Sequence, residues 1–172
     1  MNKLTKQPCP FCLKSTLTLT EDEKDIPHFG KTYIYSMTCS SCKYEKVDLE
    51  AAETKEPTRQ TFEINSAKDM NVHIVKSAEA TIKFPQLKMA VESGPNSEGY
   101  VSNIEGVLER FEKVIKQEKE NADDEGIKKN CKNLLKKIWK IKLGDIPTKI
   151  VIEDPSGNSA IISPKTKVEK LK

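Results

Sequence analysis

The amino-acid sequence predicts a fold that is mainly β-sheet with one helical hairpin, an α+β chain built in two parts. Three observations lead to this prediction. Two C-x-x-C pairs lie near the N-terminus, several short runs alternate apolar and polar residues as strands do, and two longer segments place apolar residues at helical spacing. We expect a cysteine module over residues 1–48 and a β-rich domain over residues 49–172, with a helical hairpin inserted at about 102–142.

The two cysteine pairs, Cys9-Pro-Phe-Cys12 and Cys39-Ser-Ser-Cys42, are separated by 26 residues. Between them "STLTLTEDE" and "KTYIYSMTC" alternate as strands, and "DIPHFGK" has the proline and glycine of a turn. The pattern predicts an antiparallel hairpin with one cysteine pair near each end.

Four thiolates are a complete set of ligands for a tetrahedral zinc ion, with no position left for water. We therefore predict one structural Zn²⁺ held by Cys9, Cys12, Cys39 and Cys42, in a four-cysteine zinc ribbon or finger. A module of this size with few aliphatic residues has too small a core to fold alone, and zinc binding would supply the missing free energy.

Two other readings of the cysteines are weaker. A pair of disulfides needs an oxidising compartment, which no feature of the sequence indicates. A thioredoxin-like dithiol needs a helix after its C-x-x-C, whereas "LKSTLTLT" after Cys12 favours a strand. His28 and His73 are the only histidines and are not needed as ligands.

The β-rich domain begins with four short strand-like runs, "RQTFEIN", "NVHIVKS", "EATIKF" and "LKMAVES". Two amphipathic helices follow. Ser102 with Glu105 three residues later predicts a capping box at the start of the first helix. Cys131 lies on the apolar face of the second helix and is expected to be a buried small hydrophobe. Strand character returns around "DPSGN", a turn sequence, and "KTKVEKLK" is expected to be a frayed basic tail.

Composition excludes few function classes but favours a non-catalytic protein. The chain has no phosphate-cradling glycine loop, no nucleophile paired with a base, no apolar run long enough to span a membrane and no secretory signal. We expect it to be cytoplasmic. Its net charge is only +3, and 27 of its 29 basic residues are lysines, a composition typical of a solvated surface. A nucleic-acid-binding zinc ribbon that uses the lysine-rich second helix remains the alternative function.

Four segments together resemble the ZPR-one family of zinc-finger proteins. "CPFC" with "DIPHFGKTYIYSMTCSSCKYEKVDLE" resembles its zinc finger, and "SAEATIKFPQLKMAVESG" the strands that follow. "VSNIEGVLERFE" is similar to its Thr-x-x-Glu-Gly helix start, and "IEDPSGNSAI" to its Asp-Pro-x-Gly-Asn-Ser motif. Lys43 stands where the family usually has glycine, and Ser102 where threonine is common.

The resemblance implies a zinc finger followed by a double-stranded β-helix-like domain that bears the helical hairpin. Eukaryotic members carry two such modules, whereas this chain has one and is similar to single-module archaeal relatives. The family binds proteins, so the resemblance implies a chaperone-like partner of translation elongation factor 1-alpha.

Five residues are candidate partner contacts. His28 and Phe29 lie in the finger's turn, where an exposed aromatic would anchor a partner. Asp154, Gly157 and Asn158 match the family's closing motif, although their composition equally fits an obligatory tight turn. Glu105 and Gly106 also match a family motif, and the structural reading, a helix cap and a close packing contact, is preferred for them.

Overall fold

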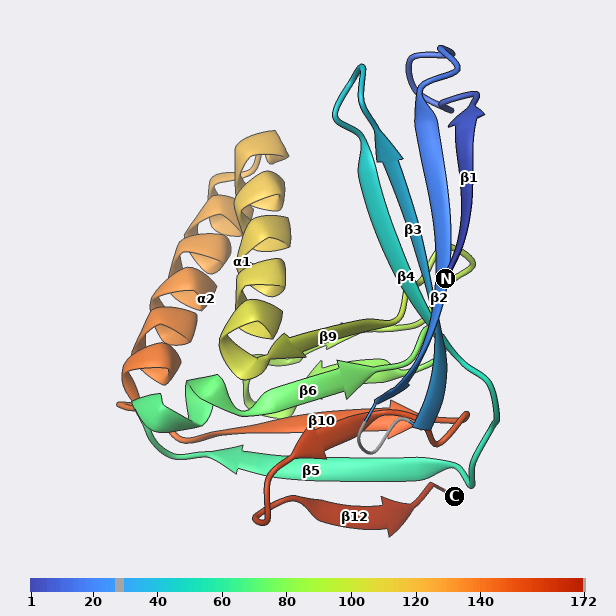
Figure 1. Ribbon diagram of the computed structural model, residues 1–172. Helices are drawn as coiled ribbons and strands as arrows, with labels where there is room; N and C mark the ends of the chain where they lie inside the picture. Colours follow the sequence, from blue (N-terminus) through green and yellow to red (C-terminus); the bar gives the residue numbers. More distant parts are fainter. Residues whose placement is uncertain (27–29, 172) are drawn as a thin grey trace.

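The structure is a computed structural model that describes residues 1–26 and 30–171. Its N-terminal part is a four-stranded antiparallel sheet, which we call the finger sheet, with the strand order β1-β2-β3-β4 (Figure 1). The strands are β1 (Asn2–Gln7), β2 (Leu17–Ile26), β3 (Gly30–Cys39) and β4 (Glu45–Ala51).

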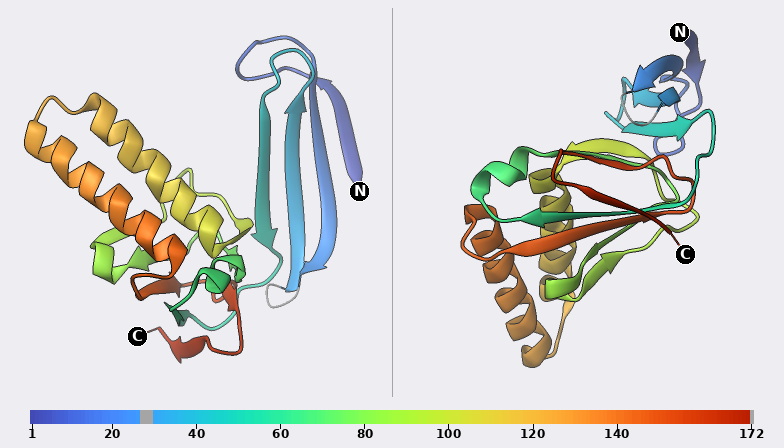
Figure 2. Two further views of the ribbon diagram at one scale, coloured as in Figure 1. Left: turned by 90° about the vertical axis from the view of Figure 1, so that its left-hand side faces the viewer. Right: turned by 90° about the horizontal axis from the view of Figure 1, so that it is seen from below.

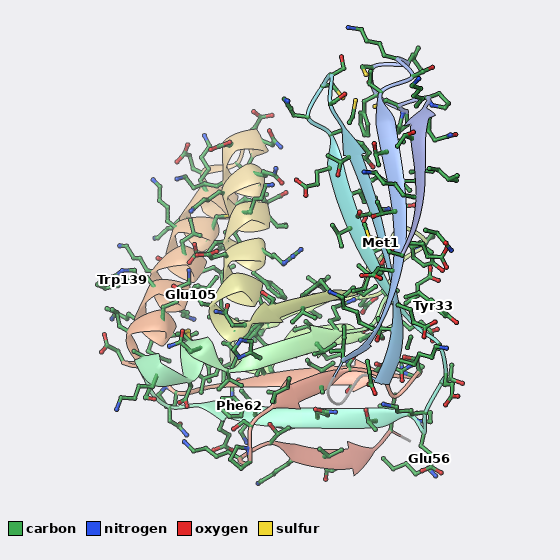
Figure 3. All side chains as sticks on the ribbon, in the orientation of Figure 1. Met1, Tyr33, Glu56, Phe62, Glu105 and Trp139 are labelled. Carbon is green, nitrogen blue, oxygen red and sulfur yellow. The ribbon has the colours of Figure 1, made fainter. Side chains whose placement is uncertain are left out.

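The predicted hairpin is confirmed as β2 and β3, which pair from Leu17 opposite Cys39 to Ile26 opposite Gly30. Tyr33 points away from the helices (Figure 3), whereas Ile34 pairs with Leu49 of β4 and faces them. The flanking strands were not predicted. The side chains of β1 are almost all exposed, so that strand has no strong apolar alternation. In β4, Val47, Leu49 and Ala51 alternate with charged residues, a pattern that is typical of a strand and that the sequence prediction did not use.

The rest of the chain forms two further sheets that face each other. The five-stranded sheet has the order β12-β5-β10-β7-β8 and the three-stranded sheet the order β11-β6-β9. Their bounds are β5 (Thr58–Ile64), β6 (His73–Lys76), β7 (Thr81–Phe84), β8 (Met89–Val91), β9 (Tyr100–Asn103), β10 (Thr148–Asp154), β11 (Ala160–Ile162) and β12 (Lys167–Lys170), with short 3-10 helices η1 (Ala67–Asn71) and η2 (Pro85–Leu87).

One hydrophobic core lies between these sheets and the helices. Successive side chains of a strand point to opposite faces of its sheet. Phe62 of β5 and Ile150 and Ile152 of β10 lie on the face that is turned toward the core, and all three are buried. Phe84 of β7 meets Phe111 edge to face with ring centroids 5.2 Å apart, so the aromatic pair joins the sheet to the helical hairpin.

The helical hairpin consists of α1 (Ile104–Asn121) and α2 (Glu125–Leu143). The predicted apolar faces are confirmed, and Cys131 is buried in the core as expected. Neither helix is long and apolar enough to cross a membrane, nor is any other helix in residues 1–26 and 30–171. The finger sheet and the helical hairpin rise side by side from the two-sheet domain (Figure 2).

Two local predictions are wrong. The N-cap of α1 is Asn103, whose Oδ1 accepts a hydrogen bond from the backbone N–H of Gly106 at 2.8 Å, and Ser102 instead lies within β9, opposite Ile74. The segment expected to be a frayed tail forms β12, which pairs with β5 from Lys167 opposite Thr61 to Lys170 opposite Thr58. All four β12 side chains are exposed, so the strand is held by backbone hydrogen bonds that composition does not reveal.

Candidate metal centre

The antiparallel pairing of β2 and β3 brings the two cysteine turns together. Because the first turn precedes β2 and the second follows β3, both lie at one end of the finger sheet. The Sγ atoms of Cys9, Cys12, Cys39 and Cys42 all lie within 4.8 Å of one another. The sequence-predicted ligand set is therefore gathered into one cluster.

The spacing of the sulfur atoms fits a tetrahedral metal. Zinc binds thiolates at about 2.3 Å, which places two sulfur atoms on one ion about 3.8 Å apart. The Sγ atoms of Cys9 and Cys42 are 3.6 Å apart, and those of Cys12 and Cys39 are 3.7 Å apart. No disulfide joins them, and each pair spans the two turns, so one ion at the centre would cross-link both ends of the hairpin.

The two turns have the same backbone geometry. In each, the residue after the second cysteine donates its N–H to the carbonyl of the first cysteine: Leu13 to Cys9 at 2.9 Å and Lys43 to Cys39 at 3.1 Å. Leu13 and Lys43 both adopt the left-handed conformation, with φ of 60° and 61°. The lysine that replaces the family's usual glycine therefore keeps the turn's geometry, at the steric cost that any side chain meets there.

Hydrogen bonds and crowding give the thiols unequal acidity. The backbone N–H of Cys42 and the hydroxyl of Thr16 lower the pKa of Cys39 to about 6. At Cys42 the backbone of Tyr44 lowers the pKa, but burial and the three neighbouring thiols outweigh it and raise the pKa to about 12. Four thiols this close resist full ionisation together, and a divalent cation would remove that conflict.

The sequence reasoning missed Thr16. Its Oγ1 lies 3.2 Å from the Sγ of Cys39 and supports that thiolate. Threonine at this position gives no signal by itself, because its role depends on the register of β2 against β3. A small apolar cluster with Leu17 at its centre covers the cysteines, and the rings of Phe11 and Tyr44 pack 4.4 Å apart beside them.

Of the predicted partner contacts, Asp154 ends β10 and Gly157 and Asn158 follow it, so these three belong to the two-sheet domain and not to the finger sheet. His28 and Phe29 lie outside the described residues. Asp154 is buried and accepts hydrogen bonds from Ser156 and Ser159. Burial acts to raise the pKa of Asp154, but the hydrogen bonds from these serines outweigh it and hold the pKa below its ordinary value.

The other two residues of the motif fix the turn against the segment that leads out of the finger sheet. The Asn158 side chain donates to the carbonyl of Glu53 at 2.8 Å. Gly157 has a φ of +68°, and a Cβ built on it would lie 2.1 Å from the carbonyl oxygen of Glu56. Their contacts among the described residues are internal, and contact with a partner stays a prediction.

Comparison with known proteins gives consistent similarities. The family profile described as the ZPR1 jelly-roll domain matches residues 68–172. A ZPR1-like protein of Methanocaldococcus jannaschii is 34% identical over 181 residues, which cover 100% of this chain and 91% of the relative. A ZPR1-like protein of Pyrococcus horikoshii is 37% identical over 95% of this chain and 75% of its own length. A Schizosaccharomyces pombe protein named zinc finger chaperone zpr1 is 26% identical over 79% of this chain and 30% of its own length.

Proposed function

Because the chain belongs to the ZPR1 family, we propose that it is a zinc-stabilised, non-catalytic protein that acts by binding another protein. The partner we propose is translation elongation factor 1-alpha, whose folding the protein would assist. The name of the fission-yeast relative, a zinc finger chaperone, supports a folding role. We place the protein in the cytoplasm, where thiols stay reduced and the elongation factor is made.

The geometry of the cysteine cluster carries the non-catalytic part of the proposal. We assign Cys9, Cys12, Cys39 and Cys42 as the ligands of one Zn²⁺. Four thiolates fill the tetrahedron of zinc, so a bound ion would have no free position for water or substrate. Its chemistry would be structural: it holds the two turns together and lets the small finger core fold.

Metal content tests the assignment of one zinc ion to the four cysteines. We expect one zinc per chain in protein purified without added metal, by plasma emission spectroscopy. Of the five cysteines, Cys131 is buried in the core, so four thiols should react with a thiol reagent after chelation and none of those four before it. Free reactivity of Cys9 and Cys12 in the metal-loaded protein would contradict the zinc assignment and favour a dithiol enzyme.

Complex formation tests the proposed partner, elongation factor 1-alpha. The protein is mixed with elongation factor 1-alpha from the same organism, both native and diluted from denaturant, and capture and refolding yield are measured. We expect capture of the refolding factor and a higher yield than with albumin as control. Failure to bind either form would overturn the partner assignment. Binding of RNA or DNA that falls steeply with salt would instead support the nucleic-acid alternative.

A further inference from the structure

A cleft of about 670 Å³ lies between the finger sheet, α1 and the two-sheet domain. In Figure 1 the finger sheet and α1 rise at opposite ends of β9, and side chains from all three of these elements line the cleft. Sites of about 300–1,000 Å³ are large enough to enclose most of a ligand. Its lining residues are scattered over strands and helix far apart in the sequence, so no motif marks it.

Apolar side chains form most of the cleft's walls. Val47 and Leu49 come from β4, and Phe111 and Val114 from α1. Val47 is 46% exposed and Val114 is 62% exposed, so apolar surface on two opposing elements remains in contact with solvent. Facing apolar walls of this kind indicate a site that another apolar group covers.

Two cations lie among these apolar walls. Lys76 is only 3% exposed, and its ammonium donates one hydrogen bond, to the carbonyl of Ser77 at 2.9 Å. The Arg110 guanidinium lies 4.1 Å from the centre of the Tyr100 ring, and the Lys76 ammonium lies 5.7 Å from it. Among the described residues, neither cation has a carboxylate within ion-pairing distance, whereas buried lysines are usually paired.

The acidic residues that the structure describes around the cleft form no ion pair with Lys76 or Arg110, and Glu98, which lines the cleft, pairs with Lys46 at 2.8 Å. Asp154 and Asp48 attract Lys76 through space, but neither forms an ion pair with it. Asp154 is engaged by its serine hydrogen bonds, and Oδ1 of Asp48 accepts from the backbone N–H groups of Leu49 and Gly99. Burial lowers the pKa of Lys76, and the nearby positive charge of Arg110 lowers it further.

Sheet edges border the cleft and favour a peptide over a small molecule. β4 is the outer strand of the finger sheet, and β8 and β9 are the outer strands of the two other sheets. All three contribute lining residues. An outer strand has unpaired backbone N–H and C=O groups, which an extended peptide can pair with.

We propose that this cleft binds an extended, apolar segment of a partner protein that carries an acidic side chain, with the carboxylate between Lys76 and Arg110. Apolar side chains of the segment would cover Val47 and Val114. This proposal rests on the proposed function in that the protein acts by binding another protein, and it adds the surface and the chemistry that the partner presents.

The test is selection of binding peptides from a random 12-residue phage library, with the metal-loaded protein as bait. We expect the enriched peptides to combine Val, Leu, Ile or Phe with Asp or Glu. Synthetic copies are then measured by fluorescence anisotropy. Failure to enrich any peptide, or enrichment of basic peptides, overturns the proposal.

Matched variants show whether the peptides occupy the cleft. Arg110→Glu should weaken their binding at least about tenfold, because a charge-assisted contact becomes a repulsion. Lys113→Glu makes the same charge change at an exposed position of α1 that does not line the cleft, and should change affinity less than about twofold. Equal binding by wild type and Arg110→Glu overturns the proposal.

Lys76→Met separates a binding role from a structural one. A lysine that only stabilised the fold would change thermal unfolding and leave peptide affinity alone. We expect the reverse, an unchanged or higher melting temperature with about tenfold weaker binding, since Met keeps the side-chain volume and removes a poorly paired charge. If Lys76→Met does not fold, Arg110→Glu, at an exposed position, decides the matter.

Capture of elongation factor 1-alpha by the same variants keeps the two proposals apart. If Arg110→Glu captures the factor as well as wild type does, the cleft proposal falls and the proposed function stands. If wild type binds acidic apolar peptides but never captures the factor, the cleft stands and the partner assignment falls.

Discussion

At the scale of single residues, Asp154 is the most heavily bonded carboxylate described in the molecule. Each of its oxygens accepts from a backbone N–H and a hydroxyl, Oδ1 from Ser156 and Oδ2 from Ser159. Asn158 donates onward to the carbonyl of Glu53. The charge of Asp154 therefore organises a turn that is itself attached to the segment after the finger sheet.

Replacement of Asp154 by asparagine should destabilise the fold by about 2–4 kcal/mol at pH 7, because an N–H donor would then face the donors of a buried serine. The pKa of Asp154 is lowered in the folded protein from an ordinary value of 3.8. Its contribution is therefore complete above that value and is lost as the pH falls through the lower folded pKa. The difference in unfolding free energy between wild type and Asp154→Asn, measured from pH 7 to pH 3, should be constant above about pH 5 and narrow as the pH falls below 3.8, by at most about 1.4 kcal/mol per pH unit.

Asp123→Asn is the matched control, since Asp123 is exposed in the connection between the helices. It should change the unfolding free energy by less than about 0.5 kcal/mol at every pH. Any acid effect on the cysteine cluster is common to all three proteins and cancels in the differences. A gap between wild type and Asp154→Asn that is the same size at pH 3 as at pH 7 would contradict the assigned role of the charge.

The role of the four cysteines as metal ligands could be predicted from the sequence, because the residue type and the C-x-x-C spacing are local features. It could not decide the role of the Asp154 motif, because the partners of a turn residue depend on which distant backbone lies beside it. Lys76 and Arg110 gave no signal at all: a lysine at the end of a strand and an arginine on a helix are ordinary surface residues until the fold buries one beside the other.

At the scale of elements, the start of α1 shows why the sequence pattern predicted the wrong N-cap residue. Ser102 and Asn103 can both cap a helix, and the pattern S-x-x-E favoured the serine. The pairing of β9 with β6 places Ser102 opposite Ile74 within a strand, so the helix can begin only after Asn103. The pairing of β9 with β6 therefore places the N-cap of α1 one residue later than the sequence pattern indicates.

Asn103→Ala should destabilise the protein by about 1 kcal/mol, because the N–H of Gly106 loses its acceptor. Ser102→Ala, its neighbour, should cost less than about 0.5 kcal/mol. Urea denaturation followed by circular dichroism measures both. A larger loss for Ser102→Ala would show that the serine is the cap after all.

The sequence predicted both helices and the strands β2, β3, β5, β6, β7, β8, β10 and β11. The elements that it missed or misjudged lie at edges. β1 and β12 have mostly exposed side chains, and their place is fixed by backbone pairing with a central strand. Side-chain patterns carry little information about a strand whose side chains are mostly solvated.

At the scale of the whole molecule, the finger sheet and the two-sheet domain, which is the jelly-roll domain of the family, differ in what stabilises them. The jelly-roll domain and the helical hairpin share one extensive core, whereas the cluster around the cysteines contains few apolar side chains. The finger sheet therefore depends on strand pairing, and on the zinc ion that we propose, more than on burial. Metal removal should act on the two parts unequally.

Chelation of the metal should unfold the finger sheet near the cysteine turns and leave the two-sheet domain folded. We expect hydrogen exchange followed by mass spectrometry to show lost protection in β2 and β3 near the cysteine turns, with protection in β5 and β10 retained. Peptide binding in the cleft should weaken as well, since Val47 and Leu49 belong to the finger sheet. Added Zn²⁺ should restore both. Equal loss of protection in β10 would show that the metal stabilises the whole fold.

The contact between Asn158 and Glu53 joins residues 105 positions apart in the chain. A ribosome completes the finger long before it makes the residues that fix its exit segment, and also before it makes β10, which holds β5 in its sheet. Chain growth therefore imposes an order: the finger can bind metal while the rest is still being synthesised, but the segment that leads out of β4 is held against the two-sheet domain by this contact only after the DPSGN turn has been made. A nascent copy would thus be unable to hold a partner until its own folding was complete.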